Sequence, residues 1–146
     1  MNIGIDKFGL AIPEFFLDIR DLAVARNENA NKFLKGLLQL EMSVSPVTQD
    51  IVTLGATAAH EFLTEEDKKK IDMVIIGTET GVDQSKSASV FIHNLLGIQP
   101  FARCIEIKEA CYGATAGLDF AKKHIENNPD SYAVSYTHLR AHETRH

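Results

Sequence analysis

An uninterrupted apolar run, Met73-Val74-Ile75-Ile76, constrains the fold of this chain more than any other stretch. A short run of this kind is typical of a strand buried on both faces of a parallel sheet. Helical spacing of apolar residues covers residues 48–63 and 85–96 on either side of it, and strand patterns follow at residues 102–108 and from Tyr132. Strand, helix, strand, helix, strand is the order of an α/β fold with right-handed crossovers. We therefore predict a mixed, largely parallel sheet flanked by helices.

The residues before that run have weaker patterns. We expect a strand over residues 3–12, ended by Pro13, and a short helix over residues 18–26. Residues 32–44 fit either a helix or an irregular strand.

Two short signals mark helix ends. Residues 64–67 (TEED) have the form of a helix-start box, with Thr64 as the cap. Gly97 suits the end of the helix over residues 85–96.

Composition argues against several classes of function. The chain has 146 residues, of which 45% are hydrophobic and 24% charged, as is ordinary for one globular domain. A net charge of −5 without a long basic run argues against a nucleic-acid partner. No apolar segment is long enough to span a bilayer, so we expect no membrane association. The two cysteines lack metal-ligand spacing, so we expect no metal site and free thiols in a reducing cytoplasm.

The most reactive candidate is Cys111, which follows the strand pattern of residues 102–108. Apolar residues at Ala114, Leu118, Ala121 and Ile125 have helical spacing, so Cys111 falls where a strand gives way to a helix. The first N–H groups of a helix lack intrahelical partners, and the helix dipole is positive there. A thiol in that place ionises more easily, and the N–H groups can bind an oxyanion. The alternative is that Cys111 is a small buried apolar residue.

Glu79 follows the buried run at residues 73–76, and Cys111 follows the next strand pattern. Ligands of parallel α/β sheets bind beyond the C-terminal ends of the strands, so the two side chains are expected over one pocket. A thiolate can take an acyl group as a thioester, and a carboxylate can move a proton on the carbon beside that carbonyl. The alternative for Glu79 is a solvated loop acid, as most loop carboxylates are.

At these residues the chain resembles the 3-hydroxy-3-methylglutaryl-CoA synthase family, and its bacterial members in particular. The segments that carry the resemblance are residues 76–80 (IGTET) with 83–87 (DQSKS), 109–116 (EACYGATA), 98–103 (IQPFAR) and 49–53 (QDIVT). The likeness covers residue 1 to about residue 134. The two segments around Glu79 and Cys111, at their consistent spacing, are together a specific signal for this family, whereas either alone would be weak.

The resemblance implies a thiolase-like fold, of which this chain is part of the N-terminal half, and a homodimer. It implies that acetyl-CoA acetylates Cys111 and that Glu79 then acts as a general base on the acetyl methyl group. The resulting carbanion attacks acetoacetyl-CoA, and hydrolysis frees 3-hydroxy-3-methylglutaryl-CoA for the mevalonate route to isoprenoids. The substrates are CoA thioesters, and no further cofactor is implied. Asn29, Ala30 and Tyr112 are implied to contact substrate.

Two other functions stay open. A β-ketoacyl-carrier-protein synthase of the same fold also uses a cysteine at a helix start, but it pairs the cysteine with histidine and asparagine, or with two histidines. Glu79 in its GTE turn favours the CoA synthase. The second alternative is that the chain alone is a non-catalytic fragment, because the resemblance implies a catalytic histidine beyond residue 146. Asn29 stands where many relatives have aspartate, and Leu38 replaces a usual glycine.

The C-terminal residues 135–146 (SYTHLRAHETRH) have no usable period and hold three of the six histidines. They resemble a translated sequencing adapter or a cloning remnant, so we divide the chain into a thiolase-like domain at residues 1–134 and a foreign tail at residues 135–146. A histidine-rich metal-binding tract is the alternative. On the first interpretation the native sequence is interrupted inside the strand that begins near Tyr132.

Overall fold

The computed structural model describes residues 3–138, which fold as two compact units. The larger unit holds residues 3–11 and 50–138, and the smaller unit holds residues 12–49. The elements of the larger unit are α2 (Ile51–His60), α3 (Glu65–Lys70), β3 (Ile71–Gly77), α4 (Ala88–Leu96), β4 (Arg103–Ile107), η2 (Ala110–Tyr112), α5 (Gly113–Asn127) and β5 (Tyr132–Thr137).

The apolar run forms β3, the central strand of a three-stranded sheet in the order β4-β3-β5. Both neighbours are parallel to β3, and Gly77 pairs with Ile107 on one side and with Thr137 on the other. Every residue of β3 except Asp72 is buried. The predicted parallel sheet with a central strand buried on both faces is therefore confirmed.

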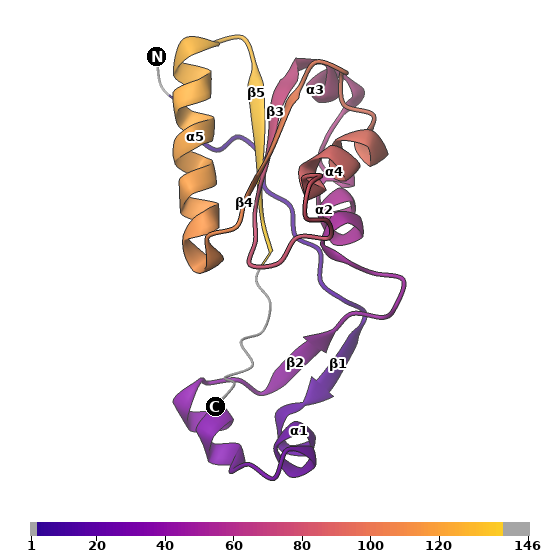
Figure 1. Ribbon diagram of the computed structural model, residues 1–146, viewed down its shortest axis with the longest axis vertical. Helices are drawn as coiled ribbons and strands as arrows, with labels where there is room; N and C mark the ends of the chain where they lie inside the picture. Colours follow the sequence, from indigo (N-terminus) through magenta and orange to yellow (C-terminus); the bar gives the residue numbers. More distant parts are fainter. Residues whose placement is uncertain (1–2, 139–146) are drawn as a thin grey trace. The chain divides into compact units, whose positions relative to one another are not determined.

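Helices cover both faces of this sheet (Figure 1). One face packs against α2, α3 and α4, and the other packs against α5. The core on the first face consists of Ile51, Val52, Ala59, Ile71, Val74, Ile76, Ala88, Ile92, Leu96 and Ile98. Val74 and Ile76 of β3 belong to this core, whereas the Ile75 side chain between them lies next to Gly117 of α5, as the period of a strand requires.

Capping side chains set the ends of these helices. Asp50 caps α2 by accepting hydrogen bonds from the N–H groups of Val52 and Thr53, at 3.0 and 2.8 Å. Thr64 caps α3 in the reciprocal arrangement with Asp67 that the sequence predicts. Gly97 ends α4 with φ of 64°, in the left-handed region that glycine adopts without a Cβ penalty.

Small residues form most of the face that α5 presents to the sheet. Its buried residues are Gly113, Ala116, Gly117 and His124, whereas Leu118 is 50% exposed. A Cβ atom on Gly117 would lie 3.2 Å from the Ile75 side chain, so small residues let the helix approach β3 closely. The helix that the spacing of Ala114, Leu118, Ala121 and Ile125 predicts is confirmed, and its contact with the sheet is made mostly by small residues.

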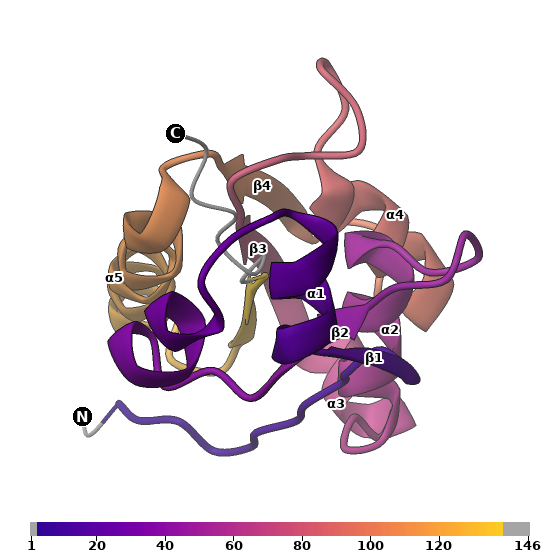
Figure 2. The ribbon, with the colours of Figure 1, turned by 90° about the horizontal axis from the view of Figure 1, so that it is seen from below.

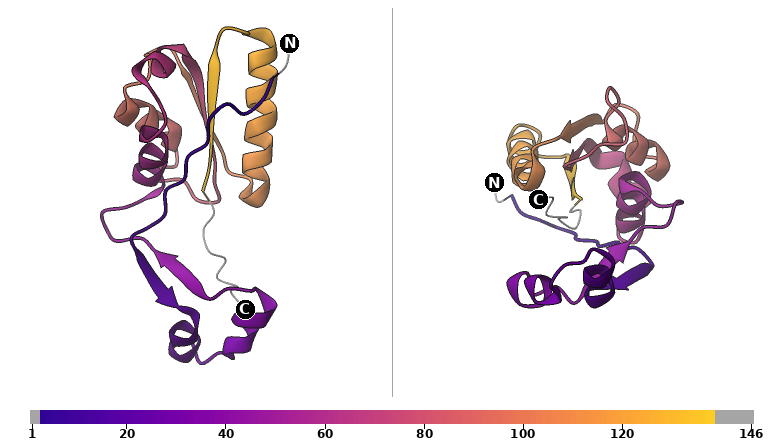
Figure 3. Two further views of the ribbon diagram at one scale, coloured as in Figure 1. Left: turned by 180° about the vertical axis from the view of Figure 1, so that it is seen from behind. Right: turned by 60° about the horizontal axis from the view of Figure 1, so that its bottom comes forward.

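The expected strand at residues 3–12 is absent from the described structure, where these residues form no ladder. The segment is instead attached through side chains. Lys7 Nζ donates to Asp67 Oδ2 at 2.5 Å, and Gly9 packs against Ala58 and Phe62 of the α2 region. Figure 3 follows it, in indigo, from the side of α5 past β5 to the helices on the other face. An alternating sequence pattern predicts an extended backbone but not a pairing partner.

The smaller unit contains β1 (Phe15–Asp18), α1 (Ile19–Ala25), the single π-helical turn η1 (Lys32–Gly36) and β2 (Glu41–Val44). β1 and β2 pair antiparallel, and the core is formed by Ile19, Ala23 and Phe33. The helix predicted over residues 18–26 is confirmed. The ambiguous region of residues 32–44 contains both a helical turn and a strand.

β5 extends across the predicted start of the tail. Residues 135–137 pair with β3, and Tyr136 packs against the core on the α2 and α4 face. Residues 139–146 lie outside the described residues. The foreign origin of the tail therefore stays a prediction.

Candidate active site

The C-terminal edge of the parallel sheet is where the candidate catalytic residues lie. Gly77 ends β3 opposite Ile107, which ends β4, so the chain leaves both strands at the same level. The Thr78 N–H extends the ladder by donating to the Ile107 carbonyl at 3.0 Å. The segments carrying Glu79 and Cys111 therefore begin side by side, as the sequence predicts for neighbouring parallel strands.

Cys111 lies in η2, which leads directly into the first residue of α5. Its side chain is exposed, so the alternative of a small buried residue is wrong for this position. Tyr112 is the N-cap of α5 and makes no side-chain capping hydrogen bond to the helix. The thiol thus lies at a helix start without a side-chain cap, a setting in which backbone N–H groups can bind an oxyanion.

An unusual backbone conformation and a close glycine contact fix this turn. Ala110 has φ of 46°, in the left-handed region that residues with a Cβ rarely adopt. A Cβ atom on Gly113 would lie 2.9 Å from the Ile107 carbonyl oxygen and 3.2 Å from Gly77 Cα. The start of α5 is therefore pressed against the ends of both strands, and Cys111 is held in the tight turn between β4 and α5.

Glu79 lies two residues beyond β3 in the loop of residues 78–87, and it is half-buried. Thr78, immediately before it, is 1% exposed. The Thr78 hydroxyl donates to the Thr80 carbonyl at 3.1 Å and accepts from the Thr80 N–H at 3.3 Å. The backbone on both sides of Glu79 is therefore fixed. The loop that carries Glu79 thus begins next to the strand that leads to Cys111.

The other predicted site residues lie in different parts of the molecule. Tyr112 follows the thiol and is 64% exposed. Asn29 and Ala30 belong to the smaller unit, between α1 and η1. The Asn29 side chain accepts from the Asn31 N–H at 2.9 Å, and Ala30 packs against that unit's core. Their contact with substrate stays a prediction.

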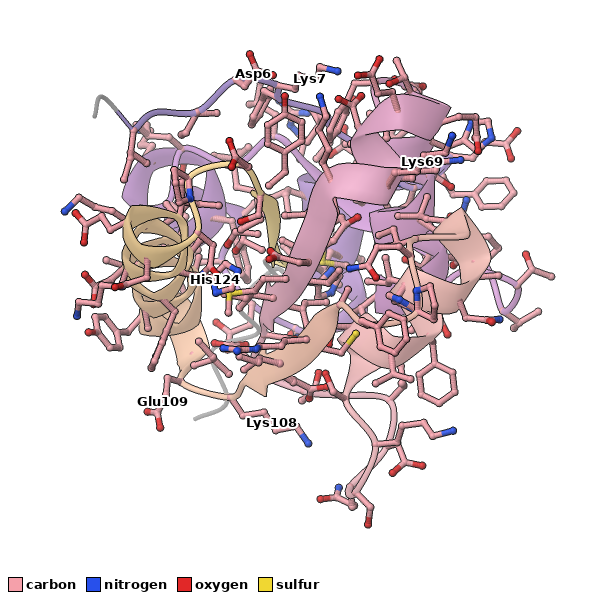
Figure 4. The ribbon with its side chains drawn as sticks, turned by 90° about the horizontal axis from the view of Figure 1, so that it is seen from above. Asp6, Lys7, Lys69, Lys108, Glu109 and His124 are labelled. Carbon is pink, nitrogen blue, oxygen red and sulfur yellow. The ribbon has the colours of Figure 1, made fainter. Side chains whose placement is uncertain are left out.

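Glu106 and Lys108 contact the 78–87 loop, and the sequence patterns above did not single them out. Glu106 lies in β4, with its side chain 6% exposed, and Lys108 follows that strand. Figure 4 shows Lys108 on the side of the 78–87 loop and Glu109 on the side of α5. The sequence did contain one signal for the burial of Glu106. It lies two residues after Cys104, and a strand places both side chains on the same face.

Within residues 3–138, no group of three or more histidine, cysteine, aspartate and glutamate side chains is placed to hold a metal ion. No helix in the same part of the chain has both the length and the apolar character that a membrane crossing requires.

The parallel sheet with helices on both faces, and the thiol at the start of α5, define a thiolase-like α/β protein. A solved HMG-CoA synthase in complex with CoA matches with a TM-score of 0.84 and 57% identity, over 90% of this chain and 34% of that chain. A structure of MvaS in complex with 3-hydroxy-3-methylglutaryl coenzyme A matches with a TM-score of 0.81 and 34% identity, over 97% and 35% of the two chains.

The chain belongs to the hydroxymethylglutaryl-coenzyme A synthase family, whose N-terminal domain matches residues 1–136. The hydroxymethylglutaryl-CoA synthase of Enterococcus faecalis is 56% identical over 130 residues, which are 89% of this chain and 34% of that protein. The 3-hydroxy-3-methylglutaryl-ACP synthase PksG of Bacillus subtilis is 34% identical over 139 residues, or 92% and 33% of the two chains. The chain thus spans about a third of the length of these relatives.

Proposed function

We propose that this chain supplies the acyl-accepting thiol and the proton-transferring carboxylate of a 3-hydroxy-3-methylglutaryl-CoA synthase. The observation that carries the proposal is the exposed Cys111 at the start of α5, beside the strand end that leads to Glu79. Membership of the family and the CoA and 3-hydroxy-3-methylglutaryl-CoA complexes of similar structures support CoA thioesters as substrates.

In the first half of the reaction, the Cys111 thiolate attacks the carbonyl carbon of acetyl-CoA. A new carbon–sulfur bond forms to the protein, the bond to the CoA sulfur breaks, and CoA leaves as the thiol by taking up the proton that the Cys111 thiol gave up. The negative oxygen of the tetrahedral intermediate lies near the start of α5, where uncapped N–H groups and the helix dipole stabilise it. The product of this half is an acetyl thioester on Cys111.

In the second half, Glu79 takes a proton from the acetyl methyl group. The carbanion attacks the ketone carbon of acetoacetyl-CoA, forming a carbon–carbon bond, and the resulting alkoxide takes up the proton that Glu79 removed. One water then hydrolyses the thioester bond to Cys111, which releases 3-hydroxy-3-methylglutaryl-CoA and returns the Cys111 thiol. The acid and the nucleophile have to lie on one edge for this sequence, because the proton leaves the carbon next to the thioester carbonyl.

An acyl-carrier-protein substrate is the second candidate, since PksG is named as an ACP-dependent synthase. The identity of 56% to the Enterococcus faecalis enzyme, against 34% to PksG, favours the CoA substrate. A homodimer and a cytoplasmic location belong to the same proposal. The free exposed thiol of Cys111 supports a reducing compartment.

Radiolabelled acetyl-CoA tests the proposal. We expect the acetyl label on the peptide that contains Cys111, its retention in a Cys104→Ser variant and its loss in a Cys111→Ser variant. Label that persists after Cys111→Ser would contradict the assignment of the nucleophile. We also expect this 146-residue chain, which spans about a third of the length of its relatives, to release no 3-hydroxy-3-methylglutaryl-CoA by itself. Complete turnover would contradict the expectation that residues outside this chain are needed.

A further inference from the structure

The loop of residues 78–87, which carries Glu79, is held at its far end by a buried carboxylate from β4. Glu106 Oε2 accepts a hydrogen bond of 2.6 Å from the N–H of Ala88, the first residue of α4. The Glu106 side chain is 6% exposed. A negative charge at a helix N-terminus is favourable, because it faces the free N–H groups and the positive end of the dipole.

The middle of the loop contacts Glu106 again and also Lys108, the residue that follows β4. Lys108 Nζ donates to the Asp83 carbonyl at 3.2 Å and lies 3.3 Å from Glu106 Oε1. Gly81 packs directly against Glu106 and Lys108, with no room for a Cβ atom. Figure 2 shows this loop, in pink, projecting beyond the start of α4. Its contacts with Glu106 and Lys108 tie the projecting loop back to the end of β4.

The near end of the loop is attached to the same strand through the 3.0 Å hydrogen bond between the Thr78 N–H and the Ile107 carbonyl. Three consecutive residues, 106–108, therefore hold the start, middle and end of the loop. The chain then continues through Glu109 and Ala110 to Cys111. Residues 106–108 thus contact the loop that carries Glu79, and the same segment leads directly to Cys111.

A contribution to helix stability alone does not explain a buried acid at this place. The start of α4 already has a local cap, because Ser87 Oγ accepts from the Ser89 N–H at 3.2 Å. Glu106 Oε1 is buried and has no hydrogen-bond partner in the described part of the chain, although Lys108 is within ion-pair distance. Burying a carboxylate with incomplete hydrogen bonding is costly. The hydrogen bond to the Ala88 N–H offsets part of this cost and attaches the carboxylate to the end of the loop.

We propose that Glu106 is a positioning residue, which fixes the 78–87 loop so that Glu79 faces the acyl group on Cys111. This inference rests on the proposed function and adds to it a residue that touches neither reacting atom. Because Ser87 caps α4 independently, removing the Glu106 carboxylate is expected to loosen the loop without unfolding the helix. A loosened loop misplaces Glu79 but leaves Cys111 at the start of α5.

The first readout is amide hydrogen exchange, which does not depend on activity. In Glu106→Gln and Glu106→Ala we expect residues 78–88 to exchange at least about tenfold faster than in the unmodified chain, with α5 unchanged. The alanine variant covers the case in which the glutamine oxygen still accepts from Ala88. Glu61→Gln, at an exposed glutamate after α2, is the control and is expected to change nothing. Unchanged exchange of residues 78–88 in both Glu106 variants would overturn the inference.

The second readout separates positioning from folding. The chain is acetylated with acetyl-CoA, transferred to D₂O, and the deuterium in the acetyl group on Cys111 is measured by mass spectrometry. For both Glu106 variants we expect undiminished acetylation but methyl exchange that is about 10- to 100-fold slower, as for a catalytic group misplaced by about 1 Å. Methyl exchange at the unmodified rate would overturn the inference, and so would a parallel loss of acetylation. If the unmodified chain accepts no acetyl group, the proposed function fails and the amide exchange alone decides the role of Glu106.

Discussion

A Cβ atom on Gly113 would lie 3.2 Å from the Cα atom of Gly77, so the first residue of α5 touches the last residue of β3 through the backbone. Cys111 lies two residues before Gly113, and Glu79 lies two residues after Gly77. This glycine pair therefore sets how closely the turn that carries Cys111 and the loop that carries Glu79 approach each other within the larger unit.

Gly77→Ala is expected to lower the free energy of unfolding by about 1–3 kcal/mol, the usual cost of overpacking. The added methyl group would lie 2.5 Å from the Ala114 nitrogen, and backbone atoms cannot move aside as a flexible side chain can. Denaturant unfolding followed by circular dichroism measures the change. Gly36→Ala is the matched control, because a Cβ there meets nothing within 4 Å. Equal effects of the two substitutions would contradict the close contact.

Leu38→Gly is expected to raise the free energy of unfolding of the smaller unit by about 0.5–1 kcal/mol, as relief of the left-handed conformation outweighs the entropic cost of glycine. Leu38 has φ of 53° and its side chain is 83% exposed, so little packing is lost. The neighbouring Leu37, with φ of −107°, provides the control: Leu37→Gly should destabilise. Thermal unfolding of the two variants gives the comparison, and stabilisation by Leu37→Gly alone would refute the prediction.

Acid is expected to weaken the attachment of the N-terminal segment. Hydrogen bonds from the Lys7 ammonium and from the Thr64 N–H and hydroxyl hold the pKa of Asp67 well below its ordinary value of 3.8. The folded state therefore favours the carboxylate, so its stabilisation is complete above that ordinary value and is lost as the pH falls toward the lowered pKa. Denaturant midpoints measured from pH 6 down to pH 3 should fall less steeply in Asp67→Asn than in the unmodified chain.

The exposed Asp130 supplies the control for this pH series. Asp130→Asn should leave the acid dependence of the unmodified chain intact. A slope that is the same in Asp67→Asn and in the unmodified chain would show that the ion pair with Lys7 does not contribute to acid stability.

The two thiols are expected to react at different rates. Burial raises the pKa of Cys104, whereas Cys111 is exposed at a helix start. Iodoacetamide at pH 8 should therefore modify Cys111 at least about tenfold faster, because the thiolate is the reacting form and it must be accessible. Peptide mass spectrometry over time measures both sites, and unfolding in guanidinium should make the two rates similar. Faster modification of Cys104 in the folded chain would be inconsistent with this placement.

Much of the larger unit could be predicted from local sequence patterns. The buried run at Met73–Ile76, the cap at Thr64 and the stop at Gly97 each depend on short-range chemistry, and the structure confirms all three. The position of Cys111 between β4 and α5 followed from adjoining strand and helix patterns for the same reason.

The features that could not be predicted depend on contacts between distant residues. The extended segment at residues 3–12 forms no ladder, because pairing depends on a partner that its own alternation does not specify. Glu106 lies 18 positions from Ala88 in the sequence, and neither residue indicates the hydrogen bond between them. The roles proposed for Glu79 and Cys111 rest on the family resemblance. The backbone contacts between their segments are seen only in the structure.

Deuterium exchange into the acetyl group on Cys111, compared between the unmodified chain and Glu79→Gln, tests most directly whether the acid and the thiol act on one bound group. The account predicts equal acetylation of Cys111 in both proteins and methyl exchange at least about 100-fold slower in Glu79→Gln, the usual contribution of a general base. Exchange at the same rate in both proteins would contradict it.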